Sequence, residues 1–177
     1  MKLGFGAIGK GYAADRAAAF LQGQGFSNYL IDVGGDLLVK GRKGGRSWEV
    51  ALRHPRRKEF LATFAAVDGA IASSGDYERY FVVEGQRYSH ILDLRTGWPA
   101  RQLSGVTVMA GSATDADALA TALFVMETSR GIALVETLPG VEAILVDTEG
   151  MMTMSSGLRL EGGRLVVDRQ QSAEGSH

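Results

Sequence analysis

The sequence predicts an α+β fold in which mixed or antiparallel sheets with hairpins pack against a few helices. Short apolar runs bounded by Gly, Asp and Pro recur along the chain and indicate strands. Several neighbouring runs are joined by short glycine turns, which is typical of hairpins. The strands do not alternate regularly with helical segments, as they would in a doubly wound parallel sheet.

Composition limits the possible classes of function. The 177 residues suggest one domain, which we place at residues 1–171, with residues 172–177 as a disordered tail. A net charge of −1 gives no general attraction to nucleic acid or anionic membranes, so no nucleic-acid partner is expected. Cysteine is absent, which excludes disulfides, thiolate metal sites and a cysteine nucleophile. The 24 glycines are about twice the share expected from the usual value of about 7% and suit tight loops near a ligand.

Residues 4–11 form a glycine-rich, Lys-bearing segment ahead of a predicted helix at residues 12–24, which Gly25 ends. The segment satisfies the glycine spacing of a dinucleotide fingerprint and most of a P-loop. The P-loop pattern fails at its last position, where Gly11 replaces Ser or Thr, and both motifs require a preceding strand. Two interpretations remain open: a phosphate cradle that uses helix-start amides and Lys10, or a simple N-terminal loop.

The middle of the chain predicts strands and hairpins. We expect one hairpin to join strands 37–40 and 47–52 through a basic glycine turn, and another to join 79–83 and 87–92. The charged run 53–58 is interpreted as a solvated loop. The remaining predicted elements are strands 28–33, 60–67, 70–73, 106–110, 141–146, 151–154 and 164–167, and a helix over 129–138.

Residues 114–122 predict a helix start with chemistry on one face. Thr114 is predicted as N-cap, with Asp115 and Asp117 in the first turn. Asp117 and Thr121 are four residues apart and therefore share a face. Their oxygens are the hard ligands that Mg²⁺ takes, although Thr-x-x-Asp is equally a capping box.

The segment 90–97 gathers His, Asp, Arg and Thr around a turn, which makes it a second candidate site. A single His such as His90 also has a purely structural explanation, a hydrogen bond within the fold.

Five segments, taken together and in order, resemble the ApbE family of FAD:protein FMN transferases. They are 6–15 (GAIGKGYAAD), 33–36 (VGGD), 72–79 (ASSGDYER), 90–97 (HILDLRTG) and 113–122 (ATDADALATA). The resemblance implies an ApbE-like, T-fold-like domain that binds FAD and Mg²⁺. It also implies transfer of FMN to a Ser or Thr hydroxyl of an acceptor flavoprotein, with release of AMP.

The resemblance also implies roles for particular residues. The metal would be held by Asp117, Thr121 and the backbone carbonyl of Ala7. The FAD-binding residues would be Lys10, Ser74, Gly75, Arg79, His90 and Ile91. Asp117 and His90 are the two candidates for the base that takes the acceptor proton. His90 is favoured because a carboxylate bound to Mg²⁺ is a poor base.

Departures from the family pattern leave alternatives open. Gly4, Gly9 and Leu94 stand where the family has Asp, Ala and Pro. Family members are longer and carry an N-terminal part before the glycine-lysine loop. One alternative is therefore a FAD-binding relative without transferase activity, and another is a Rossmann-type dehydrogenase. Many family members are exported and membrane-anchored. No signal or anchor is recognised in this sequence, so location and oligomeric state stay open.

Overall fold

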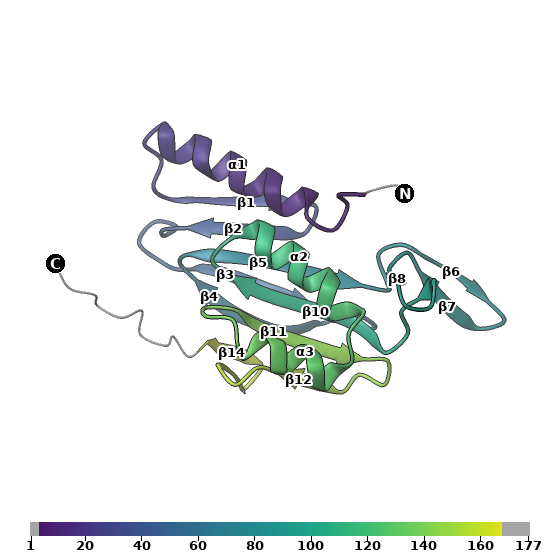
Figure 1. Cartoon of the computed structure of the whole chain (residues 1–177). Coiled ribbons are helices and arrows are strands. Elements are labelled where there is room, and N and C mark those ends of the chain that lie inside the picture. The colour runs from purple at the N-terminus through teal and green to yellow at the C-terminus, as the bar shows by residue number, and fades with distance from the viewer. Residues whose placement is uncertain (1–3, 168–177) are drawn as a thin grey trace.

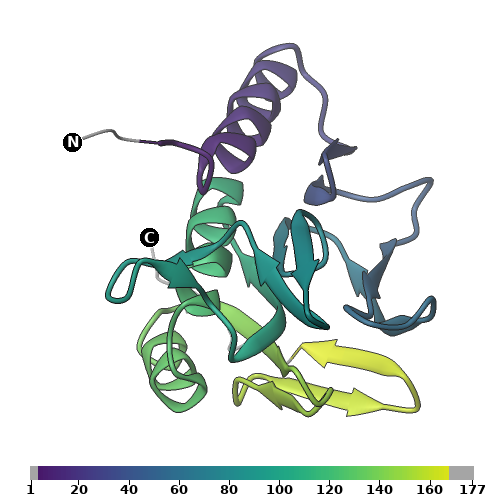
Figure 2. The same cartoon turned by 90° about the vertical axis from the view of Figure 1, so that its right-hand side faces the viewer.

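A computed structural model describes residues 4–167, which fold into three layers. The central layer is a six-stranded sheet in the order β1-β2-β5-β10-β11-β12, and every neighbouring pair in it is antiparallel. Helices α1, α2 and α3 cover one face (Figure 1), and a four-stranded sheet, β13-β14-β4-β3, covers the other (Figure 2). The predicted α+β class is confirmed, and an antiparallel central sheet contradicts the Rossmann-type alternative.

The helices are α1 (Gly9–Gly23), α2 (Ala113–Phe124) and α3 (Thr128–Val135). The central sheet contains β1 (Tyr29–Val33), β2 (Asp36–Lys40), β5 (Gly69–Gly75), β10 (Leu103–Ala110), β11 (Glu142–Asp147) and β12 (Met152–Met154). The second sheet contains β3 (Trp48–Arg53), β4 (Phe60–Ala66), β13 (Leu158–Glu161) and β14 (Arg164–Val167). Two small hairpins are formed by β6 (Tyr80–Val83) with β7 (Gln86–Ser89) and by β8 (Leu92–Asp93) with β9 (Trp98–Pro99).

Alternation along the central strands separates two hydrophobic cores. On β10, Val106 and Val108 face the helices, whereas Met109 faces the second sheet. The helix-side core also contains Ala14 and Ala116, whose small side chains let both helices lie close to the sheet. Within residues 4–167, no helix has the length and apolar character needed to span a membrane.

The predicted hairpin between strands 37–40 and 47–52 is wrong. β2 pairs with β1 and β5 of the central sheet, whereas β3 pairs with β4 in the second sheet. Gly34 and Gly35 explain the difference, because both have positive φ (61° and 95°) and form the two-residue turn between Val33 and Asp36. Such a turn matches the twist of paired strands, so it selects β1 and β2 as the hairpin.

The predicted hairpin around residues 84–86 is confirmed, with Val83 opposite Gln86. The β6–β7 hairpin projects from the end of the central sheet (Figure 1). The predicted tail at residues 172–177 lies outside the described residues.

Candidate functional site

The starts of α1 and α2 touch at Gly11. A Cβ at this position would lie 2.1 Å from the Ala113 carbonyl oxygen, so only glycine permits this approach. The Gly11 amide donates to Asp117 Oδ2 at 3.0 Å, which joins the two helices through a side chain that is only 4% exposed. This close contact brings the glycine-lysine loop and the Asp117 face of α2 together.

Asp15 fixes the start of α2 from the neighbouring helix. Its carboxylate accepts hydrogen bonds from the Ala113 and Thr114 amides, at 2.9 Å each, and from the Thr114 and Ser112 hydroxyls. The predicted N-cap Thr114 is therefore wrong, because its hydroxyl is engaged by Asp15 while Ser112 accepts from the Asp115 amide as N-cap. The helix consequently begins at Ala113, two residues earlier than an N-cap at Thr114 would give, and Asp117 lies just beyond its first turn.

Asp117 and Thr121 lie on one face of α2, as their spacing predicted. The Thr121 hydroxyl lies 3.1 Å from the Ser74 hydroxyl at the end of β5. This contact places a carboxylate and two hydroxyls between α2 and the central sheet, where hard oxygen atoms suit a divalent cation or phosphate groups.

Ala7 lies in the turn at residues 6–8, directly before α1. In a continued helix its carbonyl would accept from the Gly11 amide, but that amide donates to Asp117 instead. The Ala7 carbonyl is therefore left without this helical partner, because the amide it would accept from is bound to Asp117, the other metal ligand that the resemblance implies.

Lys10 points to a carboxylate to which the sequence had given no role. Its ammonium lies 2.8 Å from Oδ2 of Asp36, the first residue of β2, and the Asp36 side chain is only 3% exposed. Asp36 Oδ1 accepts from the Ser73 amide at 3.3 Å. Burial raises the pKa of Asp36, the Lys10 ammonium opposes that rise, and the negative charge of Asp117 adds to it. The one hint of this role in the sequence is that Asp36 directly follows the Gly34-Gly35 turn.

His90 lies at the exposed end of β7, and its Nδ1 is 3.2 Å from the Arg79 carbonyl oxygen. A carbonyl can only accept, so this hydrogen bond requires a proton on Nδ1 and leaves the lone pair of Nε2 available in the neutral ring. Arg79 is exposed, whereas the Ile91 side chain is buried in the helix-side core. No hydrogen bond or ion pair among residues 4–167 joins His90 to Asp117.

Gly75 ends β5 where the Tyr77 ring crosses it. A Cβ on Gly75 would lie 2.1 Å from Tyr77 Cε1, so the absence of a side chain is what allows the chain to turn there. The predicted FAD-binding residues therefore fall into two groups. One group, formed by Lys10, Ser74 and Gly75, lies at the start of α1 and the end of β5. The other, formed by Arg79, His90 and Ile91, flanks the β6–β7 hairpin, with the Ile91 side chain buried in the helix-side core.

The oxygen atoms around Asp117 suit Mg²⁺ shared with a substrate. Residues 4–167 contain no group of three or more His, Cys, Asp or Glu side chains arranged to hold a metal ion. Mg²⁺, however, commonly uses one or two carboxylates and completes its shell with water and phosphate oxygens. Asp117, Thr121 and the Ala7 carbonyl fit that pattern, in which a pyrophosphate would supply the remaining ligands.

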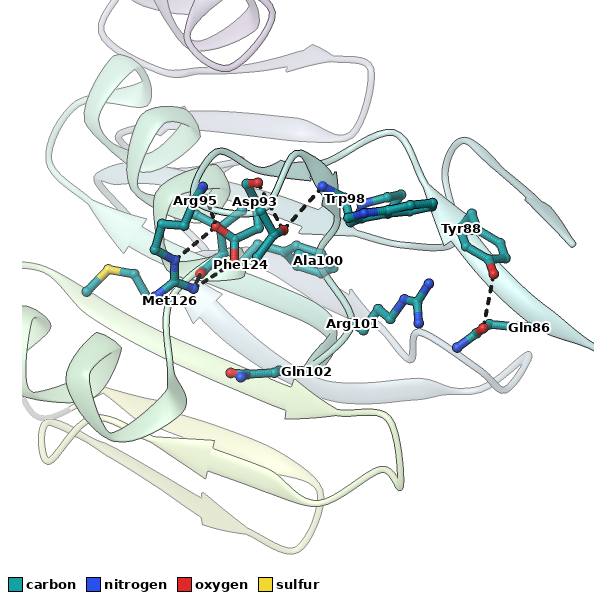
Figure 3. A pocket seen from close by; sticks show the side chains of 13 residues that line it. Gln86, Tyr88, Asp93, Arg95, Trp98, Ala100, Arg101, Gln102, Phe124 and Met126 are labelled. Carbon is teal, nitrogen blue, oxygen red and sulfur yellow. Dashed lines mark hydrogen bonds and ion pairs between the residues drawn. The ribbon is translucent and has the colours of Figure 1, made fainter. Parts of the chain in front are cut away.

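A cavity of about 560 Å³ lies beyond the C-terminal end of α2 (Figure 3). Its walls include Phe124 of α2 and Trp98 of β9. Arg95 links β8 to the end of α2, because it pairs with Asp93 at 2.8 Å and donates to the Val125 carbonyl at 3.2 Å. The hydrogen bonds from Arg95 lower the pKa of Asp93 to about 2. The segment after His90 is thus tied to the same helix that carries Asp117.

Comparison with known proteins gives one family. The model of the ApbE family matches residues 1–145. The FAD:protein FMN transferase of Treponema pallidum is 36% identical over 186 residues, covering 96% of this chain and 51% of that protein. The corresponding enzyme of Vibrio cholerae is 41% identical over 133 residues, covering 73% of this chain and 40% of that protein.

Solved structures agree with this result. The ApbE protein of Thermotoga maritima has a TM-score of 0.81 and 40% identity, covering 88% of this chain and 52% of that one. The flavin transferase ApbE of Vibrio cholerae has a TM-score of 0.74 and 36% identity, covering 85% and 49%. The chain spans about half the length of these relatives. The family model matches most of the chain, and solved ApbE structures share its fold, so the chain belongs to the ApbE family.

Proposed function

We propose that this chain catalyses the Mg²⁺-dependent transfer of FMN from FAD to a Ser or Thr hydroxyl of an acceptor flavoprotein, with release of AMP. The observation that best supports it is the contact of the two helix starts, where the Gly11 amide meets Asp117 and the Lys10 ammonium lies alongside. Helix-start amides, an ammonium and hard oxygens around one point suit a metal-bound pyrophosphate. The names of the relatives agree with flavin transfer.

The reaction exchanges a phosphoanhydride link for a phosphoester link. The acceptor hydroxyl oxygen forms a bond to the FMN phosphorus, the pyrophosphate bond to AMP breaks, and the hydroxyl proton goes to a base. Mg²⁺, when bound by Asp117, Thr121 and the Ala7 carbonyl, would neutralise charge on the pyrophosphate oxygens. Lys10 would bind a phosphate oxygen on the α1 side.

His90 is the proposed base. The Arg79 carbonyl orients its ring so that Nε2 is free to take a proton. Its exposed position at the edge of the fold suits an acceptor that must approach from solvent. Asp117 is less suited to this role, because the Gly11 amide and the metal would both withdraw charge from its carboxylate.

The activity is tested by incubating the chain with FAD, Mg²⁺ and a protein substrate of one of the relatives. We expect flavin fluorescence on the denatured acceptor and an equal amount of AMP, both abolished by a chelator. FAD binding without AMP would instead support the alternative, a flavin-binding relative without transferase activity. Calorimetry with FAD separates that outcome from a chain that binds no flavin.

The variant Asp117→Asn tests the carboxylate charge, because it removes that charge and keeps the size of the side chain. The amide oxygen can still accept from the Gly11 amide, so we expect the free energy of unfolding to change by about 1 kcal/mol or less. The lost negative charge should lower Mg²⁺-dependent transfer by about 100-fold or more. Activity retained at the wild-type level would show that Asp117 is not the metal ligand.

A further inference from the structure

Lys10, Asp36 and Asp117 lie together, yet they are paired selectively. The Lys10 ammonium is 2.8 Å from Asp36 Oδ2, and within residues 4–167 no ion pair joins it to Asp117. Asp117 is nevertheless close by, because its Oδ2 accepts at 3.0 Å from the amide of Gly11, the residue that follows Lys10. The Lys10 ammonium is therefore held by Asp36, which is not one of the predicted metal ligands.

Asp36 is built to hold a cation in one place. It is the first residue of β2, and its backbone is fixed by the Gly34-Gly35 turn and by pairing with Val33. Its Oδ1 accepts from the Ser73 amide, which orients Oδ2. Its side chain is buried, so an isolated charge here would be costly, and the Lys10 ammonium offsets that cost.

An ion pair between Lys10 and Asp117 would impair metal binding by Asp117. Lysine has a long flexible side chain and a compact charge, so without Asp36 its ammonium would turn to the nearest remaining carboxylate. An ammonium on Asp117 would neutralise the oxygen that a divalent cation needs. We propose that Asp36 is a positioning residue that holds Lys10 away from Asp117 and so keeps the Asp117 carboxylate open for a divalent cation. The metal part of this inference rests on the proposed function.

The pairing itself is tested without metal or flavin, by NMR of ¹⁵N-labelled lysine side chains. We expect Asp36→Asn to shift the Lys10 ammonium signal and speed its exchange with water, and Asp117→Asn to leave both nearly unchanged. Asp32→Asn is the matched control, because Asp32 lies in the same hairpin and, within residues 4–167, its side chain accepts only from the Gly35 amide. Asparagine can keep the bond from Ser73, and circular dichroism checks the fold. An unchanged Lys10 signal in Asp36→Asn, or an equal shift in Asp117→Asn, would overturn the pairing.

The consequence for the metal is tested with Mn²⁺, followed by electron paramagnetic resonance in the presence of FAD. We expect Asp36→Asn to weaken Mn²⁺ binding by about 10- to 100-fold, as is usual for residues that support a metal ligand. In a Lys10→Met background the same substitution should have almost no effect, because no ammonium is left to compete. Equal weakening in both backgrounds would show that Asp36 acts only through its own charge, and would refute the proposal.

The two arms separate this inference from the proposed function. A wild-type chain that binds no Mn²⁺ contradicts both the proposed metal chemistry and the metal part of the inference. The NMR response still decides whether Asp36 holds Lys10. Normal Mn²⁺ binding with no effect of Asp36→Asn would leave the proposed function standing and overturn the role of Asp36.

Discussion

Gly11 shows how one missing side chain sets the geometry of the candidate site. Its backbone lies against the Ala113 carbonyl, and its amide reaches the Asp117 carboxylate. In the sequence alone, Gly11 is the residue that breaks a P-loop pattern. Its physical role is different, because the close approach of two helices requires glycine whichever phosphate motif surrounds it.

We predict that Gly11→Ala destabilises the fold by about 1–3 kcal/mol or more, because the new Cβ would lie 2.1 Å from backbone atoms that cannot move independently. Chemical denaturation measures the loss. Gly9→Ala is the control: it lies in the same helix with open space around its Cβ, and alanine favours helix by up to about 1 kcal/mol. Equal effects of the two substitutions would contradict the packing argument.

The residues of the site differ in how far the sequence could predict them. Asp117 and Thr121 share a helix face, which follows from a spacing of four. The ion pair of Lys10 with Asp36 joins a helix start to a strand start, and no local pattern fixes such a contact. The roles in metal binding, FAD binding and catalysis all remain predictions, and they concern Ala7, Lys10, Ser74, Gly75, Arg79, His90, Ile91, Asp117 and Thr121.

At the scale of elements, α2 depends on a cap supplied by α1. Asp15 accepts two amide hydrogen bonds from the first turn of α2, and this turn also leads to Asp117. Burial raises the pKa of Asp15, but the hydrogen bonds from Thr114, Ala113 and Ser112 outweigh it, and the net pKa lies below the ordinary value of 3.8.

We predict that Asp15→Asn lowers the free energy of unfolding by about 1–2 kcal/mol at neutral pH. Because the folded-state pKa is lowered, the carboxylate stabilises the fold fully above its unfolded-state pKa, near 3.8. That contribution is lost as the pH falls through the folded-state pKa, so the two proteins should converge in acid. Urea unfolding between neutral pH and pH of about 3 measures this. Asp115→Asn, in the same turn but with an exposed side chain, should show a smaller difference.

Most helices and strands could be predicted from the sequence, but which strands pair with one another was harder to predict. The pattern of residues 12–24 predicted a helix, and α1 differs from it in beginning at Gly9 and ending at Gly23. The strand that became β3 was also predicted, yet its pairing was not. Alternation of apolar residues shows that a strand has a buried face, but does not tell which sheet buries it.

At the scale of the molecule, the central sheet is buried on both faces, and β11 shows it most clearly. Ala143 and Leu145 pack under the helices, whereas Ile144 and Val146 pack against the second sheet. The apolar run at residues 141–146 was consistent with this burial. The second sheet could not be predicted, because its strands β3, β4, β13 and β14 come from distant parts of the chain.

We predict that Ile144→Ala costs about 2–5 kcal/mol, because this side chain is fully buried between the sheets and its removal leaves a cavity. Leu160→Ala on β13 is the control, since that side chain is 40% exposed and its loss should cost far less. Denaturation midpoints compare the two. Similar losses would contradict the two-sheet core.

The helix-to-helix contacts described above also bear on how fast the site can assemble. Gly11 and Asp117 are 106 residues apart in sequence, and Asp15 and Ala113 are 98 apart. Closing so long a segment costs chain entropy before the contacts return any stabilisation, and folds dominated by such contacts fold slowly. During refolding, helical signal should therefore appear well before the chain becomes competent to bind a ligand.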